Sequence, residues 1–346
     1  MAKRVESFLD KVLDEFGDDI VLRKYEGGIP AISTGSLSID VSTGIGGVPK
    51  GRFTEIYGPE GGGKTTLLLN IAKQALLTGE KVLYIDTENG LDYAYAEEIL
   101  GKLLKEDNPI FVQPQSAESS FEIAMAGIEG GFTCILFDSV AALSPQEELD
   151  KGMDKMQVGL APRITSKFLR KVAYEIRKKE IAFIYTNQVR ANIGSYFGGY
   201  TTPAGYALKH YTSVRIYMSK SKDIEEHDKV IGNFVNFVIK KNKVGIPFRQ
   251  ATTNIIYGKG VDYYRDVISF ASLLGVIKNR GSYFAFEDET IGSKPGVTNT
   301  SRALAKDQKL LDKIVEMCYN ITGAKITQEE VKPKNDKKKK EEDKGK

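Results

Sequence analysis

The chain has 346 residues, of which 41% are hydrophobic and 27% are charged, and its formal net charge is +3. That length suits one large domain or two modest ones with a real core. No apolar run approaches the ~18 residues of a membrane span, which excludes a helical membrane protein. The first sixteen residues lack a signal-peptide core, and the two cysteines, Cys134 and Cys318, lie far apart. We therefore expect a cytoplasmic protein without a disulfide.

The positive charge is concentrated at the C-terminal end of the chain. Residues 331–346 contain eight lysines and four acids, a net charge of +4, so the rest of the chain carries −1. Bulk charge therefore gives no reason to assign nucleic-acid binding to the body, and such an assignment has to rest on local loops. The tail has almost no apolar residues, which predicts disorder and either a solubilising role or a weak contact with polyanions.

An amphipathic helix over 3–16 and a linker rich in glycine and serine precede a series of alternating strands and helices. Short β-rich runs that enter loops at their C-terminal ends, with helices between them, indicate a mostly parallel sheet covered on both faces. Further strands, some antiparallel, lead to a smaller lobe from about residue 261, with short helices, one strand over 282–288 and a terminal helix. Strands are predicted at 51–57, 81–86, 110–113, 133–138, 181–187, 212–218, 234–243 and 252–257, and helices at 92–104, 117–129 and 160–179.

The stretch from Gly58 to Thr65, GPEGGGKT, lies between a predicted strand and a predicted helix. It fits the pattern G-x-x-x-x-G-K-[ST], whose glycines let successive N–H groups curve around phosphate oxygens while the helix N-terminus adds positive potential. In that pattern Lys64 reaches the β- and γ-phosphates, and the Thr65 hydroxyl is a ligand of Mg²⁺. A glycine-rich turn without a ligand does not account for all the fixed positions. The stretch therefore predicts a nucleoside triphosphate site.

Acids at the ends of two other predicted strands could complete such a site. Asp138 follows four apolar residues and could simply cap a strand, but beside a phosphate loop it is better explained as the acid that orders Mg²⁺ through water. Asp86 and Glu88 follow another strand, and either could orient the water that attacks the phosphate. Alternation places both on one face, so the spacing does not choose between them. These residues predict a P-loop ATPase and nothing finer.

Seven stretches of the chain carry a further resemblance, and several of them are much more specific than the phosphate loop alone. In their order and spacing they resemble the RecA family of bacterial homologous recombinases, and the resemblance covers about residues 5–325. The stretches are ISTGSLSID, GRFTEIYGPEGGGKTT, YIDTENGLD, FDSVAAL, TNQVRANIG, ALKHYTSVRI and KKNKVGIPFRQATTNIIYGKG.

The resemblance implies an α/β fold: a RecA-like P-loop ATPase core with a mostly parallel twisted sheet, an N-terminal helix and a small α+β C-terminal lobe. It implies a homo-oligomeric helical filament that coats single-stranded DNA, pairs it with homologous double-stranded DNA and exchanges strands with turnover of ATP and Mg²⁺. Recombination, DNA repair and the SOS response to DNA damage are the implied processes. The implied divisions are an N-terminal helix and linker for oligomerisation (1–30), an ATPase core with two DNA-binding loops (31–260), the C-terminal lobe (261–325) and a disordered lysine-rich tail (326–346).

The resemblance also implies roles for single residues. Lys64 and Glu88 would be catalytic, with Glu88 orienting the attacking water, and Gln188 would sense the γ-phosphate. Lys241 and Lys243 would reach the nucleotide of a neighbouring subunit, although lysines at a strand end are more often simply solvated. The implied ATP-binding residues are Gly58, Pro59, Glu60, Gly61, Gly62, Gly63, Lys64, Thr65, Thr66, Asp92, Tyr95 and Tyr257, with Thr65 and Asp138 at the metal.

Two loops would contact DNA according to the resemblance. The first covers 148–163 and is followed by a helix, and the second covers 189–209 and mixes a cation, glycines, threonines and aromatic residues. Such a loop suits N–H contacts to phosphates and apolar wedges between bases, although without the resemblance a surface loop for any partner would be as good an explanation. The implied DNA-binding residues are Val158, Gly159, Arg163, Ser166, Arg170, Arg190, Ile193 and Gly205.

The chain departs from the family pattern in two places. Where members commonly read T-T-G-G-N-A-L-K-F, residues 202–210 read TPAGYALKH, so a glycine is lost, a proline enters, and His210 replaces the usual aromatic residue at a subunit contact. His210 could titrate near neutrality or simply replace that surface. The tail ends lysine-rich where bacterial relatives commonly end acidic, and a basic tail could restrain access of duplex DNA less. These departures bear on loop geometry and on coupling, and they leave the class unchanged.

Two other classes of protein share parts of these patterns. One is a RecA-core ATPase motor or regulatory paralogue without strand exchange, and the other is a DNA-binding filament protein that barely hydrolyses ATP. The two DNA loops, the N-terminal helix and the C-terminal lobe favour a recombinase over the first class. The intact set of Lys64, Glu88 and Asp138 favours it over the second.

Overall fold

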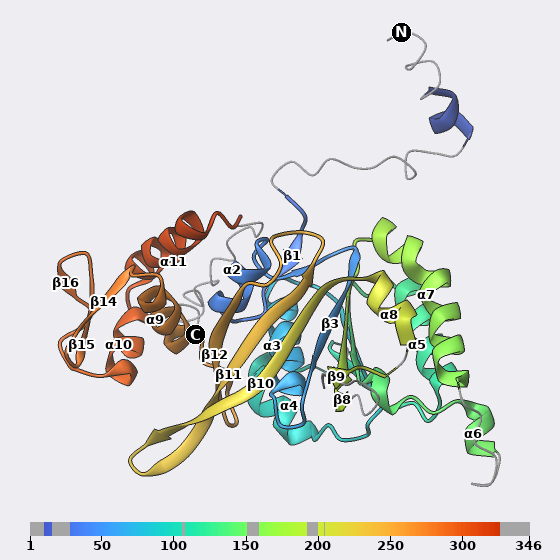
Figure 1. Ribbon diagram of the computed structural model, residues 1–346, viewed down its shortest axis with the longest axis horizontal. Helices are drawn as coiled ribbons and strands as arrows, with labels where there is room; N and C mark the ends of the chain where they lie inside the picture. The colour runs from blue at the N-terminus through green and yellow to red at the C-terminus, as the bar shows by residue number, and fades with distance from the viewer. Residues whose placement is uncertain are drawn as a thin grey trace, which may run out of the picture.

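A nine-stranded sheet forms the centre of the computed structural model of the chain (Figure 1). Its strand order is β13-β12-β11-β10-β3-β7-β6-β4-β5. The strands from β10 to β5 run parallel to one another, and β11, β12 and β13 are antiparallel to their neighbours. The predicted mostly parallel α/β sheet is therefore confirmed. The structure describes residues 10–15, 28–105, 108–150, 159–191, 200–203 and 205–325.

The order of strands brings four carboxyl ends to one edge of the sheet. Strands β3, β7, β6 and β4 are four consecutive and parallel strands of the sheet, so the loops that follow them lie together. The sheet strands are β3 (Arg52–Gly58), β4 (Val82–Asp86), β5 (Ile110–Val112), β6 (Cys134–Asp138), β7 (Ala182–Gln188), β10 (Thr212–Glu226), β11 (Lys229–Asn242), β12 (Gln250–Ile256) and β13 (Gly260–Val261).

Helices cover both faces of the parallel strands (Figure 1). Tyr84 and Leu136 pack with α3 (Lys64–Leu77) and α4 (Tyr93–Leu100), whereas their chain neighbours Leu83 and Ile135 pack on the opposite face. This alternation explains why the strands read as continuous apolar runs: side chains of both orientations are buried. The second face is covered by α5 (Ala117–Glu129), α7 (Leu160–Lys178) and α8 (Gly205–Tyr211).

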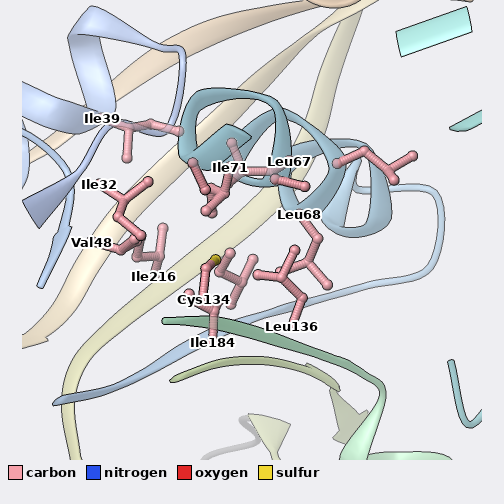
Figure 2. Close-up of a cluster of buried hydrophobic side chains, with 14 of the residues drawn as sticks. Ile32, Ile39, Val48, Leu67, Leu68, Ile71, Cys134, Leu136, Ile184 and Ile216 are labelled. Atoms are coloured by element: carbon pink, nitrogen blue, oxygen red, sulfur yellow. The ribbon is translucent and has the colours of Figure 1, made fainter. Parts of the chain in front are cut away.

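The first of these core layers lies directly beneath the helix that follows the phosphate loop. Figure 2 shows Leu67, Leu68 and Ile71 of α3 above Leu136 and Ile184 of the sheet. All five side chains are fully buried. Because burial of each such side chain contributes about 1.5–3 kcal/mol, this contact fixes the position of α3 on the sheet.

The sequence predicted a linker ahead of residue 51, and this prediction is wrong from residue 31 onward. The segment contains α2 (Leu37–Thr43), every residue of which is buried, between the paired strands β1 (Ala31–Ile32) and β2 (Val48–Pro49). Ser36 caps the start of α2 by accepting from the N–H of Ile39, and Gly44 ends it with φ +84°. Ser36 and Gly44 are helix caps here, whereas the sequence prediction treated the glycines and serines of this segment as a linker.

Two buried carboxylates hold α2 in place: one belongs to α2 itself, and the other to α9 (Tyr263–Leu273), the first helix of the C-terminal lobe. Asp266 of α9 accepts hydrogen bonds from the N–H (2.9 Å) and hydroxyl (2.9 Å) of Ser38. Asp40 accepts from the N–H (2.8 Å) and hydroxyl (2.6 Å) of Thr34. Burial raises the pKa of Asp40 to about 7 and the pKa of Asp266 to about 6, against the lowering effect of these donors.

The C-terminal lobe contains more β-structure than the single strand expected at 282–288. Three short antiparallel strands form a separate sheet beside three helices, and their apolar core includes Leu37 and Val41 of α2. The run 277–280, which is mostly polar, pairs with the expected strand, and the turn between them contains Gly281 with φ +64°. The elements are β14 (Ile277–Arg280), β15 (Tyr283–Phe286), β16 (Glu289–Thr290), α10 (Val297–Leu304) and α11 (Gln308–Thr322).

Strands β10 and β11 are longer than the runs 212–218 and 234–243 expected for them, and their hairpin projects beyond the sheet (Figure 1). Polar residues dominate the added part, which explains why its strand character was missed. Of the expected N-terminal helix, 10–15 is described and helical; the remainder and the tail 326–346 lie outside the described residues. Within the described parts of the chain, no helix is long and apolar enough to cross a membrane.

Candidate active site

The loop between β3 and α3 takes its shape from its glycines. Gly61 and Gly63 have φ of +70° and +80°, the left-handed region that favours glycine. A Cβ on Gly58 would overlap the carbonyl oxygen of Met218, so the loop lies directly against β10. A Cβ on Gly61 would meet nothing within 4 Å, so that side of the loop is open. A tight loop with an open side at a helix N-terminus fits a phosphate chain.

Lys64 is the cation of this loop. Its Nζ donates to the carbonyl oxygens of Gly58 (3.2 Å) and Pro59 (2.8 Å), so the side chain folds back over the loop that precedes it. Burial lowers the pKa of Lys64, while the carboxylates of Asp138 and Glu88 act to raise it. The ammonium group therefore lies at the loop, among negative groups that favour its charged form.

Asp138, at the end of β6, is the centre of a buried hydrogen-bond network. Its Oδ2 accepts from the hydroxyls of Thr65 (2.8 Å) and Tyr84 (2.8 Å), and its Oδ1 accepts from the hydroxyl of Thr186. Burial raises the pKa of Asp138, and these three donors counteract the rise. Sequence reasoning paired Asp138 with Thr65 and missed the other two residues: Tyr84 lies within the apolar part of β4, and Thr186 begins a polar run at the end of β7.

This pair of oxygen groups fits Mg²⁺, which binds to few protein ligands and keeps water and phosphate oxygens around it. A hydroxyl at the start of α3 lies within 2.8 Å of a carboxylate at the end of β6. No group of three or more His, Cys, Asp or Glu that could hold a metal occurs among the described residues. The donor set therefore suits an ion that arrives with a nucleotide.

The structure separates the two acids that sequence spacing left equivalent. Asp86 is 3% exposed, and its carboxylate accepts from the N–H groups of Glu88 (3.2 Å) and Leu91 (3.0 Å) and from the Gln113 side chain (2.9 Å). Glu88 is exposed. Asp86 thus holds the loop after β4 in place, and the carboxylate of Glu88 faces outward.

Glu88 meets residues from two other strand ends. Its Oε1 accepts from the hydroxyl of Ser139 and from Nε2 of Gln188 at 3.3 Å. These contacts join the loops after β4, β6 and β7. The residue expected to orient water and the residue expected to sense the γ-phosphate are therefore in direct contact, 100 positions apart in sequence.

Three of the expected ATP-binding residues, Asp92, Tyr95 and Tyr257, lie outside the phosphate loop and α3. Asp92 caps α4 by accepting from the N–H of Ala94 at 2.8 Å, and the Tyr95 hydroxyl shares a 2.7 Å hydrogen bond with Thr66 on the first turn of α3. Tyr257 follows β12 and is 52% exposed. Tyr95 thus lies beside the phosphate loop, and Asp92 begins the helix that carries it.

Lys241 and Lys243 lie away from the phosphate loop, near the amino-terminal ends of the parallel strands β10 and β3. The Lys243 N–H donates to the carbonyl of Ser213, which lies beside Phe53 at the start of β3. The strand residues between that level and Gly58 span roughly 15 Å. Both lysine Nζ atoms contact the His210 carbonyl at 3.4 Å, at the end of α8. Burial, followed by the like charge of Lys243, lowers the pKa of Lys241.

Most residues expected to bind DNA lie on one side of α7 or flank the second loop. Arg163 and Arg170 are exposed and Ser166 is half-buried, at a spacing that places the three on one face of α7. Arg190, at the start of the second loop, is exposed. Gly159 begins α7 with φ +93°, and Gly205 begins α8 with φ +82°; Val158 and Ile193 lie outside the described residues.

Sequence reasoning missed a buried amide that links the end of β7, where Gln188 contacts Glu88, to the second loop. Nδ2 of Asn187 donates to Glu55 (2.9 Å) and to the Pro203 carbonyl (3.3 Å), while its Oδ1 accepts from the Gln188 N–H (3.0 Å). Arg215 forms an ion pair with the other oxygen of Glu55. Asn187 and Glu55 are fully buried. The available signal was the polar run Thr-Asn-Gln at the end of an apolar strand.

Comparisons with known proteins agree along the length of the chain. A model of the RecA N-terminal domain matches residues 3–262. Protein RecA of Pseudomonas fluorescens (strain Pf0-1) is 39% identical over 318 residues, 90% of this chain and 89% of that protein. Protein RecA of Lactiplantibacillus plantarum is 35% identical over 346 residues, covering 99% and 90%. Protein RecA of Clostridioides difficile (strain 630) is 38% identical over 327 residues, covering 92% and 92%.

Proposed function

This chain belongs to the RecA family, and we propose that it is an ATP-dependent DNA recombinase. It forms filaments on single-stranded DNA, pairs that strand with a homologous duplex and exchanges strands, in recombination and DNA repair. One observation carries this function: Glu88 contacts Gln188 beside a complete phosphate loop, in a chain aligned with Protein RecA over most of its length. An N-terminal helix, two DNA loops and a C-terminal lobe, with the divisions 1–30, 31–260, 261–325 and 326–346, are the corresponding proposed parts.

The phosphate loop and the first turn of α3 would hold Mg–ATP. The loop N–H groups and Lys64 would bind the triphosphate, and the Thr65 hydroxyl would be a metal ligand while Asp138 orders the metal's water ligands. When bound, Mg²⁺ neutralises charge on the β- and γ-phosphates. The 2.8 Å contact between Thr65 and Asp138 supports this assignment, because it places both oxygen groups beside the loop.

Glu88 would orient the water that attacks the γ-phosphate. Its carboxylate is exposed and held by one hydroxyl and one amide, whereas Asp86 is buried and fully engaged with backbone and side-chain donors. A carboxylate that keeps a free oxygen at the loop edge can accept a hydrogen bond from water. Gln188 would report the state of the γ-phosphate to the loop that follows it, because it contacts Glu88 on one side and begins that loop on the other.

Lys241 and Lys243 would act on the nucleotide of a neighbouring subunit. They lie too far from the phosphate loop of their own chain to reach its γ-phosphate. A cation that is supplied across an interface stabilises the charge that develops during phosphoryl transfer, as an arginine finger does. Hydrolysis would therefore depend on assembly of the filament.

Strand exchange between a circular single strand and a homologous linear duplex tests this function. With Mg–ATP we expect joint molecules and then nicked circular duplex, and with ATP withheld we expect neither. An ATPase motor or regulatory paralogue would hydrolyse ATP without forming joint molecules from homologous DNA. That result, under conditions where the chain coats single strands, would remove the recombinase assignment.

A further inference from the structure

One aromatic side chain near the C-terminal end of the second loop (189–209) lies almost entirely in solvent. Tyr206, the second residue of α8, is 89% exposed, more than any other large hydrophobic residue in the described parts of the chain. Leu208, two positions later, is 3% exposed and packs into the core beneath α7. Helix α8 is therefore anchored through Leu208 and presents Tyr206 on its outer side. A fixed, exposed ring has most of its area free to contact a partner.

The surroundings of Tyr206 are strongly basic. Helix α8 packs on the first turn of α7, because a Cβ on Gly205 would lie 3.2 Å from Cβ of Pro162 (α7 and α8 in Figure 1). The sequence over 159–174 and 205–211 contains no Asp or Glu. Five cations lie on these two stretches: Arg163, Lys167, Arg170 and Lys171, all exposed, and Lys209, whose Nζ is 5.7 Å from the centre of the Tyr206 ring.

We propose that Tyr206 is a further contact to single-stranded DNA and that its ring stacks on a base. The proposal rests on the proposed function. Cations that follow a phosphate backbone, combined with an exposed aromatic ring, are the two components of surfaces that bind single strands. The faces of bases are free in a single strand and covered in a duplex, so this ring favours the single strand.

The chain has no tryptophan, so Tyr206→Trp introduces a single indole at this position. With Mg–ATP and the full chain, we expect an oligothymidylate to quench its fluorescence. An abasic oligonucleotide of equal length should bind through its phosphates and leave the fluorescence nearly unchanged. Tyr174→Trp, at a tyrosine of α7 that is 48% exposed, is the matched control and should respond to neither strand.

Affinity gives an independent measure. Tyr206→Ala should weaken binding of oligothymidylate by about 5- to 100-fold, the range for loss of one stacked base, while Tyr206→Phe retains parental affinity. Both variants should bind ATP as the parent does, because Tyr206 does not contact the phosphate loop. Tyr174→Ala should leave DNA affinity unchanged.

Three results would overturn the proposal. The first is equal DNA affinity of Tyr206→Ala and the parent, and the second is equal quenching by the abasic strand. The third is full quenching by Mg–ATP alone, in a concentration-dependent way, which would place the ring against a second copy of the chain. A parent chain that fails to bind single strands at all would instead overturn the proposed function, so the two failures are distinguishable.

Discussion

The nucleotide edge of the sheet and the DNA side of the molecule are built differently. At the nucleotide edge, Lys64, Glu88, Asp138 and Gln188 follow four adjacent strands, and hydrogen bonds already join their loops. On the side that we propose binds DNA, the candidate residues lie on one helix and at the ends of a loop whose residues 192–199 lie outside the described parts. Sheet register alone brings the first site together, whereas the second depends on how a surface loop meets its partner.

Strand β7 is the element that both regions share. Three consecutive residues at its end serve three different contacts: Thr186 donates to Asp138, Asn187 to the Pro203 carbonyl, and Gln188 to Glu88. A change at the nucleotide can therefore reach the second loop through one short piece of rigid strand. The comparison predicts that substitutions can abolish the function of one region and leave the other intact. It also predicts that a substitution between the regions can remove their coupling while both keep their function.

The largest expected effect separates hydrolysis from binding at the nucleotide edge. Glu88→Gln should lower DNA-dependent ATP hydrolysis on the order of 10²- to 10⁴-fold, because the amide no longer accepts a proton from water. It should still bind ATP and DNA, and it should form long-lived filaments. Steady-state phosphate release and nucleotide binding would be measured together.

Asp86→Asn is the matched control for Glu88→Gln. Its buried carboxylate accepts from backbone N–H groups, so the substitution should lower the free energy of unfolding. The turnover rate of the folded protein should stay close to that of the parent. If Glu88→Gln hydrolyses ATP as the parent does, Asp86 or another group orients the water.

A smaller loss is expected from Lys243→Ala, which removes a cation that we propose acts across the filament interface. It should fold and bind ATP as a monomer, yet lose DNA-stimulated hydrolysis by roughly 10²- to 10³-fold, less than a full arginine finger because Lys241 remains. Mixing it with Lys64→Ala should restore part of the activity, since each variant supplies the half-site that the other lacks. The restored rate should fall on dilution. Mixtures that stay inactive while filaments form would place the lysines outside the shared site.

A third prediction concerns stability far from either region, at the junction of α2 and α9. Burial raises the pKa of Asp40 to about 7 in the folded chain, above its ordinary value, so the folded state binds more protons between these values. Stability from this group is therefore fully present at low pH and is lost as pH rises through about 7. Between pH 5 and pH 8 the loss should be roughly 2–3 kcal/mol.

Asp40→Asn tests this dependence. An amide can accept from both Thr34 donors through its oxygen while its NH₂ group faces Ser33. Denaturant titrations at several pH values should therefore show a flatter profile for the variant than for the parent, with Asp266 still titrating. Parallel profiles for the two proteins would show that Asp40 is ionised throughout.

The smallest expected effect is the uncoupling of the two regions. Asn187→Ala removes the hydrogen bond to the Pro203 carbonyl and the acceptor for the Gln188 N–H. We expect the ratio of single-strand affinities with ATP and with ADP to fall by about fivefold or more, the low end of typical coupling energies. Thr202→Ala is a nearby control, because its buried hydroxyl has no hydrogen-bond partner among the described residues. An unchanged ratio in Asn187→Ala would assign the coupling to another route.

Much of the nucleotide edge could be predicted from the sequence because most of its residues follow a clear apolar run, whereas the role of Gln188 came only from the resemblance. The phosphate loop, Asp138 and the pair Asp86 and Glu88 were all located this way. The choice between Asp86 and Glu88 required either a resemblance or three dimensions, since it depends on which carboxylate is occupied by backbone donors. The α/β sheet was predictable for the same reason as the site.

Other features depend on contacts between segments far apart in the chain, and periodicity does not report them. The buried helix α2 was read as a linker because its caps are serine and glycine, and its burial depends on Asp266, 228 positions from Ser38. The pairing of Glu55 with Arg215 and Asn187 spans 160 and 132 positions. Polar residues in strands carry little local signal about which partner will satisfy them.

Equilibrium binding of single-stranded DNA with ATP, with ADP and without nucleotide, across a range of salt, tests the central claim most directly. Because Gln188 contacts Glu88 and directly precedes the DNA loop, ATP should tighten binding and ADP should loosen it. In each state the affinity should fall steeply with salt, since the basic surface displaces counterions from the phosphates. Equal affinity in all three nucleotide states at every salt concentration would contradict the coupling of the two regions.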